Sequence, residues 1–337
     1  MTSYGFKLFK LELVKRDGRT AQPWTYEGPK KTEKLVLDDL EALIRKHIAK
    51  PERGLPLGAD ARPLSAAERK ARPVFQIEDV DRVGTHALFL KLRYGRHRDE
   101  DLGLPASELA TTTQVDLTEI APTRSYRIGI LAPSSGKTGM MVVEAIAGAC
   151  PSKYFMKWMR RWAVDAATKA DKVDESWQKL TAHAAMDPVL LRRYVNQANA
   201  DSVVLVQRST GSSRLRRDER FRVEAAVFSN QSRKVMELAE TAIVSDNTEE
   251  QTDAEYAKEL AELLGKDDLS DLDFDDGWVV VDTASGKQQI SPSRVPEIFV
   301  YPIDNRQPTD RNFRVETKKE VVRVRRTVGA TLDLSGW

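Results

Sequence analysis

The sequence predicts an α+β fold made mainly of antiparallel strands, with β-hairpins and several amphipathic helices. Three observations predict it. Several short segments alternate apolar and polar residues with a period of two, and others repeat apolar residues with a helical period. A third is that turn-forming residues separate neighbouring strand-like segments by short distances, which is typical of hairpins. The 337 residues, 41% of them hydrophobic, are enough to bury a core without disulfides.

Strand-like and helix-like segments follow one another through the first half of the chain. The clearest pattern is a β-hairpin over 126–146 that leads, after Pro151, into an amphipathic helix over 154–167. Trp158 and Trp162 share the apolar stripe of this helix, so we expect both in the core. Strands are expected at 6–14, 86–94, 115–120, 126–131 and 140–146, and helices at 35–48 and 154–167.

The second half of the chain repeats this mixture. Asp187-Pro188 is a typical helix start, because an aspartate can cap the first turn and proline fits into it. The last sixty residues alternate or run apolar, which predicts strands. Helices are expected at 187–195, 229–244 and 254–264, and strands at 202–206, 221–228, 278–281, 299–301, 314–316 and 321–328.

Charge is distributed unevenly, and this suggests where domains end. Residues 237–276 hold fifteen Asp and Glu against Lys258 and Lys266. We therefore expect a main α+β domain over 1–245, an acidic helix and linker over 246–276, and a β-rich C-terminal segment over 277–337.

Composition limits the class of protein. A single cysteine, Cys150, excludes an internal disulfide framework and a multi-cysteine zinc site, and four scattered histidines argue against a multi-histidine metal centre. No apolar run approaches the ~20 residues of a membrane-spanning helix, and the N-terminus lacks a signal-peptide pattern. We therefore expect a cytoplasmic protein that binds no cofactor and no membrane.

Three clusters of basic residues favour contact with nucleic acid, because phosphates bind Lys and Arg without any need for base recognition. We expect the first cluster in a loop and the second on one face of a strand. The third would lie on the outer face of the helix over 154–167. The clusters are Arg214, Arg216, Arg217 and Arg220; Arg323 and Arg325; and Lys153, Lys157, Arg160 and Arg161.

Nuclease activity is one alternative. Asp304, Glu316 and Lys318 form an acidic pair followed by a lysine, which resembles the active-site pattern of the restriction-endonuclease-like nucleases. In that family the carboxylates hold Mg²⁺ and the lysine positions or activates the attacking water. The resemblance would imply Mg²⁺ as a cofactor, whereas a surface hairpin with outward charges explains the same residues without chemistry.

Nucleotide binding is a second alternative. Gly136-Lys137-Thr138 follows a β-prone segment and resembles the end of a phosphate-binding loop. The motif needs glycine where this chain has Leu131, and Pro133 removes a backbone donor from the loop. We therefore expect a hairpin turn here, with Lys137 kept as the nucleotide-binding candidate.

The acidic segment supports a third hypothesis, a protein-interaction subunit that docks a basic partner through residues 246–276. The leading hypothesis remains a nucleic-acid-contacting component of a bacterial multi-protein system. Phage defence is one such setting, although no residue specifies it. The contacts this hypothesis predicts are the first two basic clusters, Arg214, Arg216, Arg217, Arg220, Arg323 and Arg325.

Overall fold

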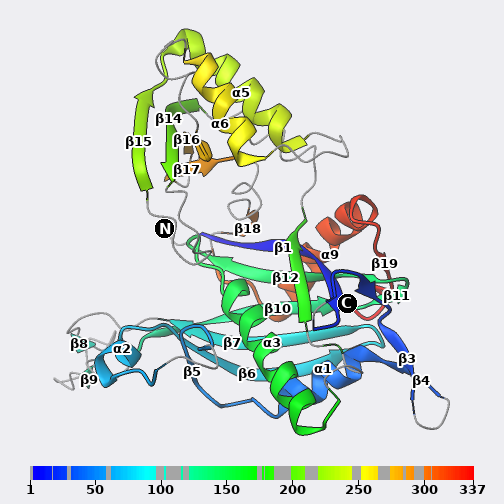
Figure 1. The fold of residues 1–337 in the computed structure, drawn as a ribbon. Helices are drawn as coiled ribbons and strands as arrows, with labels where there is room; N and C mark the ends of the chain where they lie inside the picture. The colour runs from blue at the N-terminus through cyan, green and yellow to red at the C-terminus, as the bar shows by residue number, and fades with distance from the viewer. Residues whose placement is uncertain are drawn as a thin grey trace. The chain divides into compact units, whose positions relative to one another are not determined.

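A computed structural model describes most of the chain as an α+β fold with a large antiparallel sheet that curls into a half-barrel (Figure 1). The predicted fold class is therefore confirmed. The described residues are 3–16, 18–28, 32–57, 62–95, 102–103, 115–116, 121–172, 177, 179–185, 199–208, 219–244, 252–264, 274–283, 286–291, 300–304 and 306–337.

The chain divides into two compact units. Unit 1 contains residues 1–185 together with 300–337, and unit 2 contains residues 186–299. This division differs from the boundaries at 245 and 276 that the charge pattern suggested. Residues 300–337 belong to the same unit as the N-terminal strand, because residues 301–304 pair with that strand although they are far from it in the sequence.

Unit 1 is built on a nine-stranded antiparallel sheet. Its path runs β13-β1-β12-β10-β7-β6-β5, and β2 and β18 also pair with β1. The strands are β1 (Tyr4–Val14), β2 (Ala21–Gln22), β5 (Glu52–Arg53), β6 (Val74–Val83), β7 (Ala87–Gly95), β10 (Thr123–Leu131), β12 (Thr138–Ile146), β13 (Lys179–Ala184) and β18 (Tyr301–Asp304). Shorter pairs are formed by β3 (Thr25–Glu27) with β4 (Glu33–Leu35), β8 (Leu102–Gly103) with β9 (Val115–Asp116), and β11 (Pro133–Ser135) with β19 (Thr331–Leu332).

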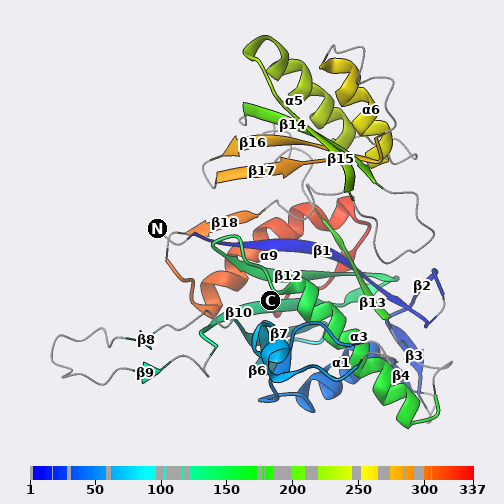
Figure 2. The same cartoon turned by 60° about the vertical axis from the view of Figure 1, so that its left-hand side comes forward.

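One face of the sheet carries the main core of unit 1. Helices α1 (Val36–Arg45) and α3 (Ser152–Lys169) cover this face, and the short α2 (Ala66–Lys70) precedes β6 (Figure 2). Alternate strand residues such as Ile128, Met141 and Leu90 point into this core and meet apolar residues of both helices. The apolar stripe of each helix therefore packs on the apolar side chains that the strands place on this face of the sheet.

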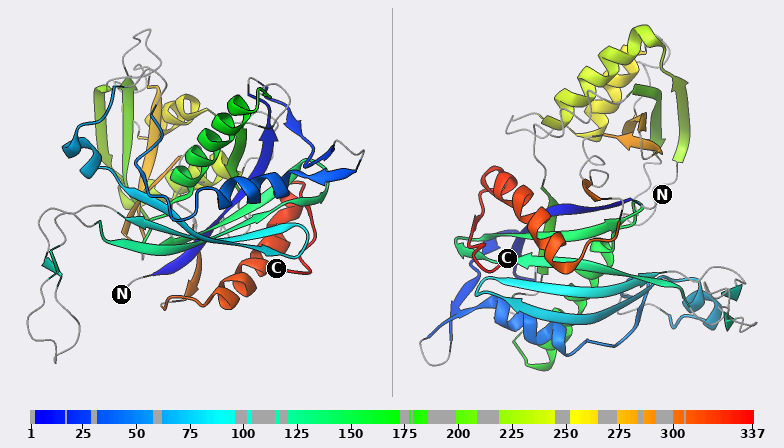
Figure 3. Two further views of the ribbon diagram at one scale, coloured as in Figure 1. Left: turned by 90° about the horizontal axis from the view of Figure 1, so that it is seen from below. Right: turned by 180° about the vertical axis from the view of Figure 1, so that it is seen from behind.

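The opposite face is covered by α9 (Asp310–Thr327) and the residues that follow it (Figure 3). Phe313 of α9 packs edge-on against Phe6 of β1 at a ring distance of 6.2 Å. The C-terminal Trp337 lies over Gly129 of β10, where any Cβ would come within 2.2 Å of the indole. Trp337 Nε1–H also donates to Thr317 Oγ1 of α9, so the chain end holds the helix on the sheet.

Residues 186–299 interrupt an edge strand of unit 1. β13 and β18 pair antiparallel with the same edge of β1, with Ala184 opposite Phe9 and Tyr301 opposite Phe6. The two strands thus run in the same direction, one after the other along β1. Unit 2 is an insertion at this point.

Unit 2 contains a four-stranded antiparallel sheet in the order β15-β14-β16-β17. Its strands are β14 (Asn199–Arg208), β15 (Glu219–Ala226), β16 (Asp276–Thr283) and β17 (Gly286–Ile290), and its helices are α5 (Ser229–Val244) and α6 (Asp253–Leu263). Both helices pack against the sheet, as their apolar stripes require; Gly277 of β16 lies where a Cβ would be 2.8 Å from the Ala257 Cβ of α6. The helix expected at 187–195 lies outside the described residues.

The secondary structure near the C-terminus corrects one prediction. Residues 314–316 and 321–328 were expected as strands, but all of them except Val328 belong to α9, which ends at Thr327. Phe313, Thr317, Val321 and Val324 are buried, at spacings of four, four and three residues, which is a helical stripe. The hairpin of β10 with β12 and the helices α1, α3, α5 and α6 agree with the prediction.

Candidate nucleic-acid interface

Helix α3 presents one apolar and one basic face. Phe155, Met159 and Trp162 are buried, while Trp158 is only partly buried. Of the two tryptophans expected in the core, Trp162 is therefore buried and Trp158 only in part.

The outer face of α3 and its C-terminal end form what we call the basic strip. The end of α1 adds two further lysines, because Lys46, Lys50 and Lys169 all lie close enough to His47 to influence its charge. All members of the strip are exposed. They are Lys153, Lys157, Arg160, Arg161, Lys169, Lys172, Lys46 and Lys50.

Few carboxylates neutralise the basic strip. Among the described residues, Arg161 forms an ion pair with Asp165 at 3.1 Å, and no such pair is formed by Lys153, Lys157 or Arg160. These three residues occupy one side of about two helical turns, so they span roughly 10 Å along the axis. That length matches about three steps between successive phosphates of one strand in a duplex, each about 3.4 Å along its axis.

Aromatic packing holds the basic strip in place. The His47 ring stacks on Trp162 with centroids 4.0 Å apart and an angle of 11°. Trp162 Nε1–H donates to Glu52 Oε1 at 3.3 Å, and Trp158 Nε1–H donates to the Gly54 carbonyl at 2.9 Å. Three elements, α1, β5 and α3, are therefore joined beneath the strip.

Burial changes the proton affinity of two groups in this packing. Burial, followed by the charge of Lys50, lowers the pKa of His47 below its ordinary value. Burial also raises the pKa of Glu52, against the hydrogen bond from Trp162. The neutral form of His47 is thus favoured, and the positive charge of the strip comes from lysine and arginine.

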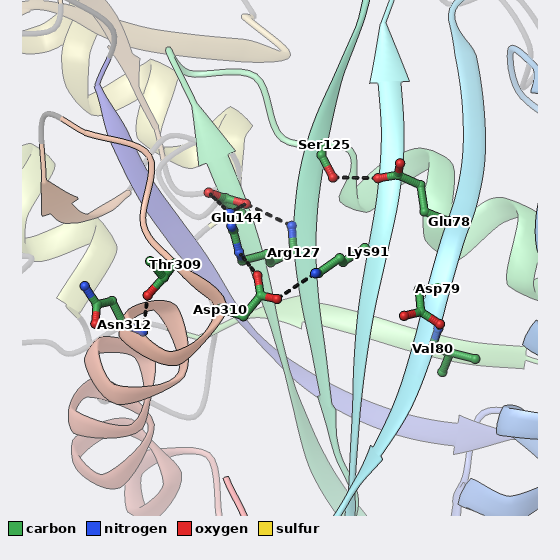
Figure 4. A network of polar contacts seen from close by, with 10 residues as sticks. All are labelled: Glu78, Asp79, Val80, Lys91, Ser125, Arg127, Glu144, Thr309, Asp310 and Asn312. Atoms are coloured by element: carbon green, nitrogen blue, oxygen red, sulfur yellow. Dashed lines mark hydrogen bonds and ion pairs between the residues drawn. The ribbon is translucent and has the colours of Figure 1, made fainter.

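Helix α9 carries a second row of basic residues, and a polar network fixes its first turn to the sheet (Figure 4). Thr309 caps the helix by accepting the Asn312 N–H at 3.2 Å. Asp310, the next residue, forms ion pairs with Lys91 of β7 at 2.6 Å and Arg127 of β10 at 2.7 Å. Lys91 and Arg127 of the sheet therefore bind the first residue of the helix.

Arg127 also binds Glu144 of β12, which is fully buried. The Arg127 backbone N–H and guanidinium both donate to this carboxylate, at 2.9 and 3.1 Å. Burial raises the pKa of Glu144, while the Arg127 guanidinium opposes that rise. Burial alone would also raise the pKa of Asp310, but Lys91 and Arg127 hold it below the ordinary value. The network is a structural anchor for α9.

Sequence reasoning did not identify this network. The available signal was a charged residue inside each of two largely apolar segments, Arg127 in 126–131 and Glu144 in 140–146. Beside it, Glu78 of β6 accepts from Ser125 of β10 at 2.6 Å (Figure 4). Glu78 also accepts from Arg93 of β7 at 2.5 Å.

The structure changes the roles expected for Arg323 and Arg325. They lie on α9 and not on one face of a strand, and they differ in exposure. Arg323 is exposed and pairs with Glu320 at 3.0 Å, whereas Arg325 donates to the Leu332 carbonyl at 3.2 Å. The outward-facing cations of α9 are Arg311, Lys319, Arg323 and Arg326.

The nuclease candidates are not arranged as the resemblance requires. Glu316 and Lys318 are two residues apart on a helix and therefore point in different directions. Glu316 pairs with Lys319 at 2.7 Å, and Lys318 Nζ donates to the carbonyls of Leu334 and Trp337. Asp304 lies in β18. Within the described part of the chain, no group of three or more His, Cys, Asp or Glu could hold a metal ion.

Lys137 lies in a tight turn between β11 and β12. Gly136 has a positive φ of 89°, which glycine adopts without strain, and the Lys137 carbonyl accepts the Trp24 Nε1–H at 3.0 Å. A strand follows the turn, so the helix N-terminus that a phosphate-binding loop needs is missing at this place. The hairpin turn expected from the sequence is correct.

The remaining candidates can be placed only in part. Arg214, Arg216 and Arg217 lie outside the described residues, and Arg220 is in β15.

Burial raises the pKa of the Cys150 thiol, which disfavours a reactive thiolate. None of the helices that the structure describes has the length and apolar character of a membrane span.

Comparison of the chain with protein-family models, curated proteins and solved structures finds no match. Its function is therefore inferred from geometry and charge.

Proposed function

We propose that the protein binds nucleic acid through the basic strip, by contacts to the phosphate backbone. The observation that carries this proposal is the row of Lys153, Lys157 and Arg160, which are exposed on one helix face and form no ion pair with a described carboxylate. Such cations release bound counterions from nucleic acid, and this release drives binding without base recognition.

The charge of the whole unit supports this proposal. Unit 1 holds 39 Lys and Arg against 29 Asp and Glu, while unit 2 holds 14 against 22. The chain's net charge of +2 therefore conceals one unit with a charge of +10 and another with −8. A basic unit attracts a polyanion over a distance comparable with the Debye length of about 10 Å at 0.1 M salt.

The test measures fluorescence polarisation of labelled single- and double-stranded DNA and RNA at 50 to 200 mM salt. We expect Lys153→Ala, Lys157→Ala and Arg160→Ala together to weaken binding at least tenfold. They should also lower the slope of log affinity against log salt for duplex DNA by about 3, since each lost phosphate contact removes about one unit.

The matched control neutralises three arginines on the opposite face of the sheet: Arg311→Gln, Arg323→Gln and Arg326→Gln. It changes the net charge equally, so a general charge effect would weaken both variants alike. Loss of affinity only in the α9 variant would assign binding to α9 and overturn the proposal for the basic strip. Flat titrations of the unaltered protein with every nucleic acid would overturn nucleic-acid binding itself.

A further inference from the structure

Strand β15 forms one edge of the unit-2 sheet (Figure 1). It pairs with β14 on one side, and among the described residues no strand pairs with its other side. Phe221 in this strand is 45% exposed, and Phe228 just after it is 68% exposed. Residues 221–226 contain neither proline nor glycine, and their pairing with β14 has no bulge. An edge of this kind can pair with a further strand, because its outer N–H and C=O groups have no strand beside them.

The hydrogen bonds between β15 and β14 show which backbone groups point outward. Val227, directly after β15, donates its N–H to the carbonyl of Asp201 in β14 at 3.0 Å. Successive residues of a strand direct these groups to opposite sides, so Val223 faces β14 as Val227 does. The N–H and C=O groups of Arg222 and Glu224 therefore point to the free edge.

The residues along this edge are self-complementary about Val223. Arg222 and Glu224 lie on one face of the sheet, 3.8 Å apart within the strand, and their side chains are 47% and 54% exposed. Phe221, Val223 and Ala225 lie on the other face. If a second copy pairs antiparallel with the two Val223 residues opposite each other, each Arg222 lies opposite the Glu224 of the other copy. Each Phe221 then lies opposite an Ala225, so a large side chain meets a small one.

The neighbouring registers lack this complementarity. Hydrogen bonding through the outward-pointing groups of both copies requires that the pairing shift by whole residue pairs. A pairing centred on Arg222 would place two arginines directly opposite each other, and one centred on Glu224 would do the same with two glutamates. Like charges in these positions are destabilising, so the register centred on Val223 is favoured.

We propose that β15 pairs with the β15 of a second copy of this chain, so that two unit-2 sheets join into one antiparallel sheet about a twofold axis. A twofold interface uses the same surface of both copies and must therefore be self-complementary. The arrangement of charges about Val223 has this property, and it selects a second copy over a strand of another protein. The inference concerns unit 2 and does not rest on nucleic-acid binding by unit 1.

The test is sedimentation velocity of the full-length protein without nucleic acid. Concentrations run from about 1 to about 200 µM, because an interface of one strand pair is small and small interfaces are weak. We expect a monomer–dimer equilibrium. Arg222→Glu and Glu224→Arg, made separately, each place like charges opposite each other and should weaken dimerisation at least tenfold.

Two further samples separate loss of pairing from loss of folding. An equal mixture of the Arg222→Glu and Glu224→Arg variants should form dimers, because one chain then carries two carboxylates at these positions and the other carries two guanidinium groups. The double variant should dimerise as well, since the reversed charges again oppose each other. The matched control, Arg233→Glu, reverses one charge of the exposed Arg233–Glu237 pair on α5 and should dimerise as the unaltered protein does.

Three results would overturn the proposal: an unaltered protein that stays monomeric at every concentration, single reversals that dimerise as tightly as the control, or a mixture of the two reversals that forms no dimers. The variant in which Lys153, Lys157 and Arg160 are replaced by alanine should dimerise normally. A failure of dimerisation is therefore distinguishable from a failure of nucleic-acid binding.

Discussion

Arg127 and Glu144 place two opposite charges side by side on adjacent strands beneath α9. Glu144 is fully buried and the Arg127 side chain is 13% exposed, so water can stabilise neither of them well. Glu144 depends on Arg127, because a buried ion left without its partner keeps its desolvation penalty, whereas Arg127 also pairs with Asp310.

We therefore expect Arg127→Ala to lower the free energy of unfolding by about 3–5 kcal/mol, measured by urea denaturation. Glu144→Ala should cost less, because Arg127 keeps its ion pair with Asp310. Replacing both residues, as Arg127→Met with Glu144→Leu, should cost clearly less than the sum of the single changes, since no charge is then left unpaired. Single changes that each cost below about 1 kcal/mol would show that the pair is solvated like a surface ion pair.

A second residue-level prediction concerns pH and His47. Burial against Trp162 lowers the pKa of His47, so the fold favours the neutral ring over the charged one. The neighbouring charges are Lys46, Lys50, Lys169 and Asp165, of which only Asp165 favours protonation.

The sign of the effect follows from linkage. The unfolded chain binds a proton at His47 near the ordinary pKa of about 6.5, whereas the folded protein binds it only at lower pH. Above the ordinary pKa of about 6.5, His47 is neutral in both states and does not make stability depend on pH. As the pH falls from about 7 toward the folded-state pKa, the unfolded chain gains the proton first and the free energy of unfolding decreases. We expect the melting temperature to decrease less between pH 7.5 and 5.5 in His47→Gln than in the unaltered protein. Equal decreases would contradict this prediction.

At the scale of elements, α9 is fixed to the sheet through its first turn and through the residues that follow its C-terminal end. Asp310 anchors its first turn to Lys91 and Arg127, and Trp337 returns from the chain end to lie on Gly129. Lys318 adds hydrogen bonds from the helix to the last residues. The helix position therefore depends on the absence of a side chain at residue 129.

We expect Gly129→Ala to destabilise the protein by about 1–3 kcal/mol, because its methyl group would overlap the Trp337 ring. Trp337→Ala should cost about 3 kcal/mol through lost burial. In the Trp337→Ala background, Gly129→Ala should cost almost nothing, which a double-mutant cycle of thermal or urea unfolding measures. Additive losses would mean that residue 129 and the indole do not interact.

At the scale of the whole molecule, unit 2 is inserted into an edge strand of unit 1. Ala184 lies opposite Phe9 and Tyr301 lies opposite Phe6, so the chain leaves and re-enters unit 1 at nearly the same point of β1. The two positions are about 10 Å apart at ~3.3 Å for each of three strand residues.

Because the gap is short, replacing residues 186–299 with a Gly-Ser linker of about three to five residues should leave unit 1 folded. We expect a cooperative thermal transition and a dispersed amide NMR spectrum for the shortened chain. The proposed function adds that this chain should still bind DNA, and more tightly than the full-length protein at low salt, because the acidic unit is gone. A molten or aggregated product would show that unit 1 needs unit 2 to fold.

The sequence by itself determined the elements whose pattern is local. Alternation marks β1, two β-prone runs separated by turn residues mark the β10–β12 hairpin, and helical periodicity marks α1, α3, α5 and α6. Each of these patterns depends only on residues that are near one another in the sequence. The same reasoning placed Lys153, Lys157, Arg160 and Arg161 on the outside of α3, where the structure has them exposed.

Tertiary structure decided the rest. Val322 to Arg325 alternates apolar and basic residues well enough to predict a strand, yet burial of Val321 and Val324 with Phe313 against the sheet selects a helix. Lys46 and Lys50 join the basic strip only because α1 packs beside α3. The contact of Asp310 with Arg127 spans 183 residues, and the two halves of the edge strand on β1 are separated by all of unit 2. Such pairings depend on which faces meet after the chain has folded, and no local pattern in the sequence encodes them.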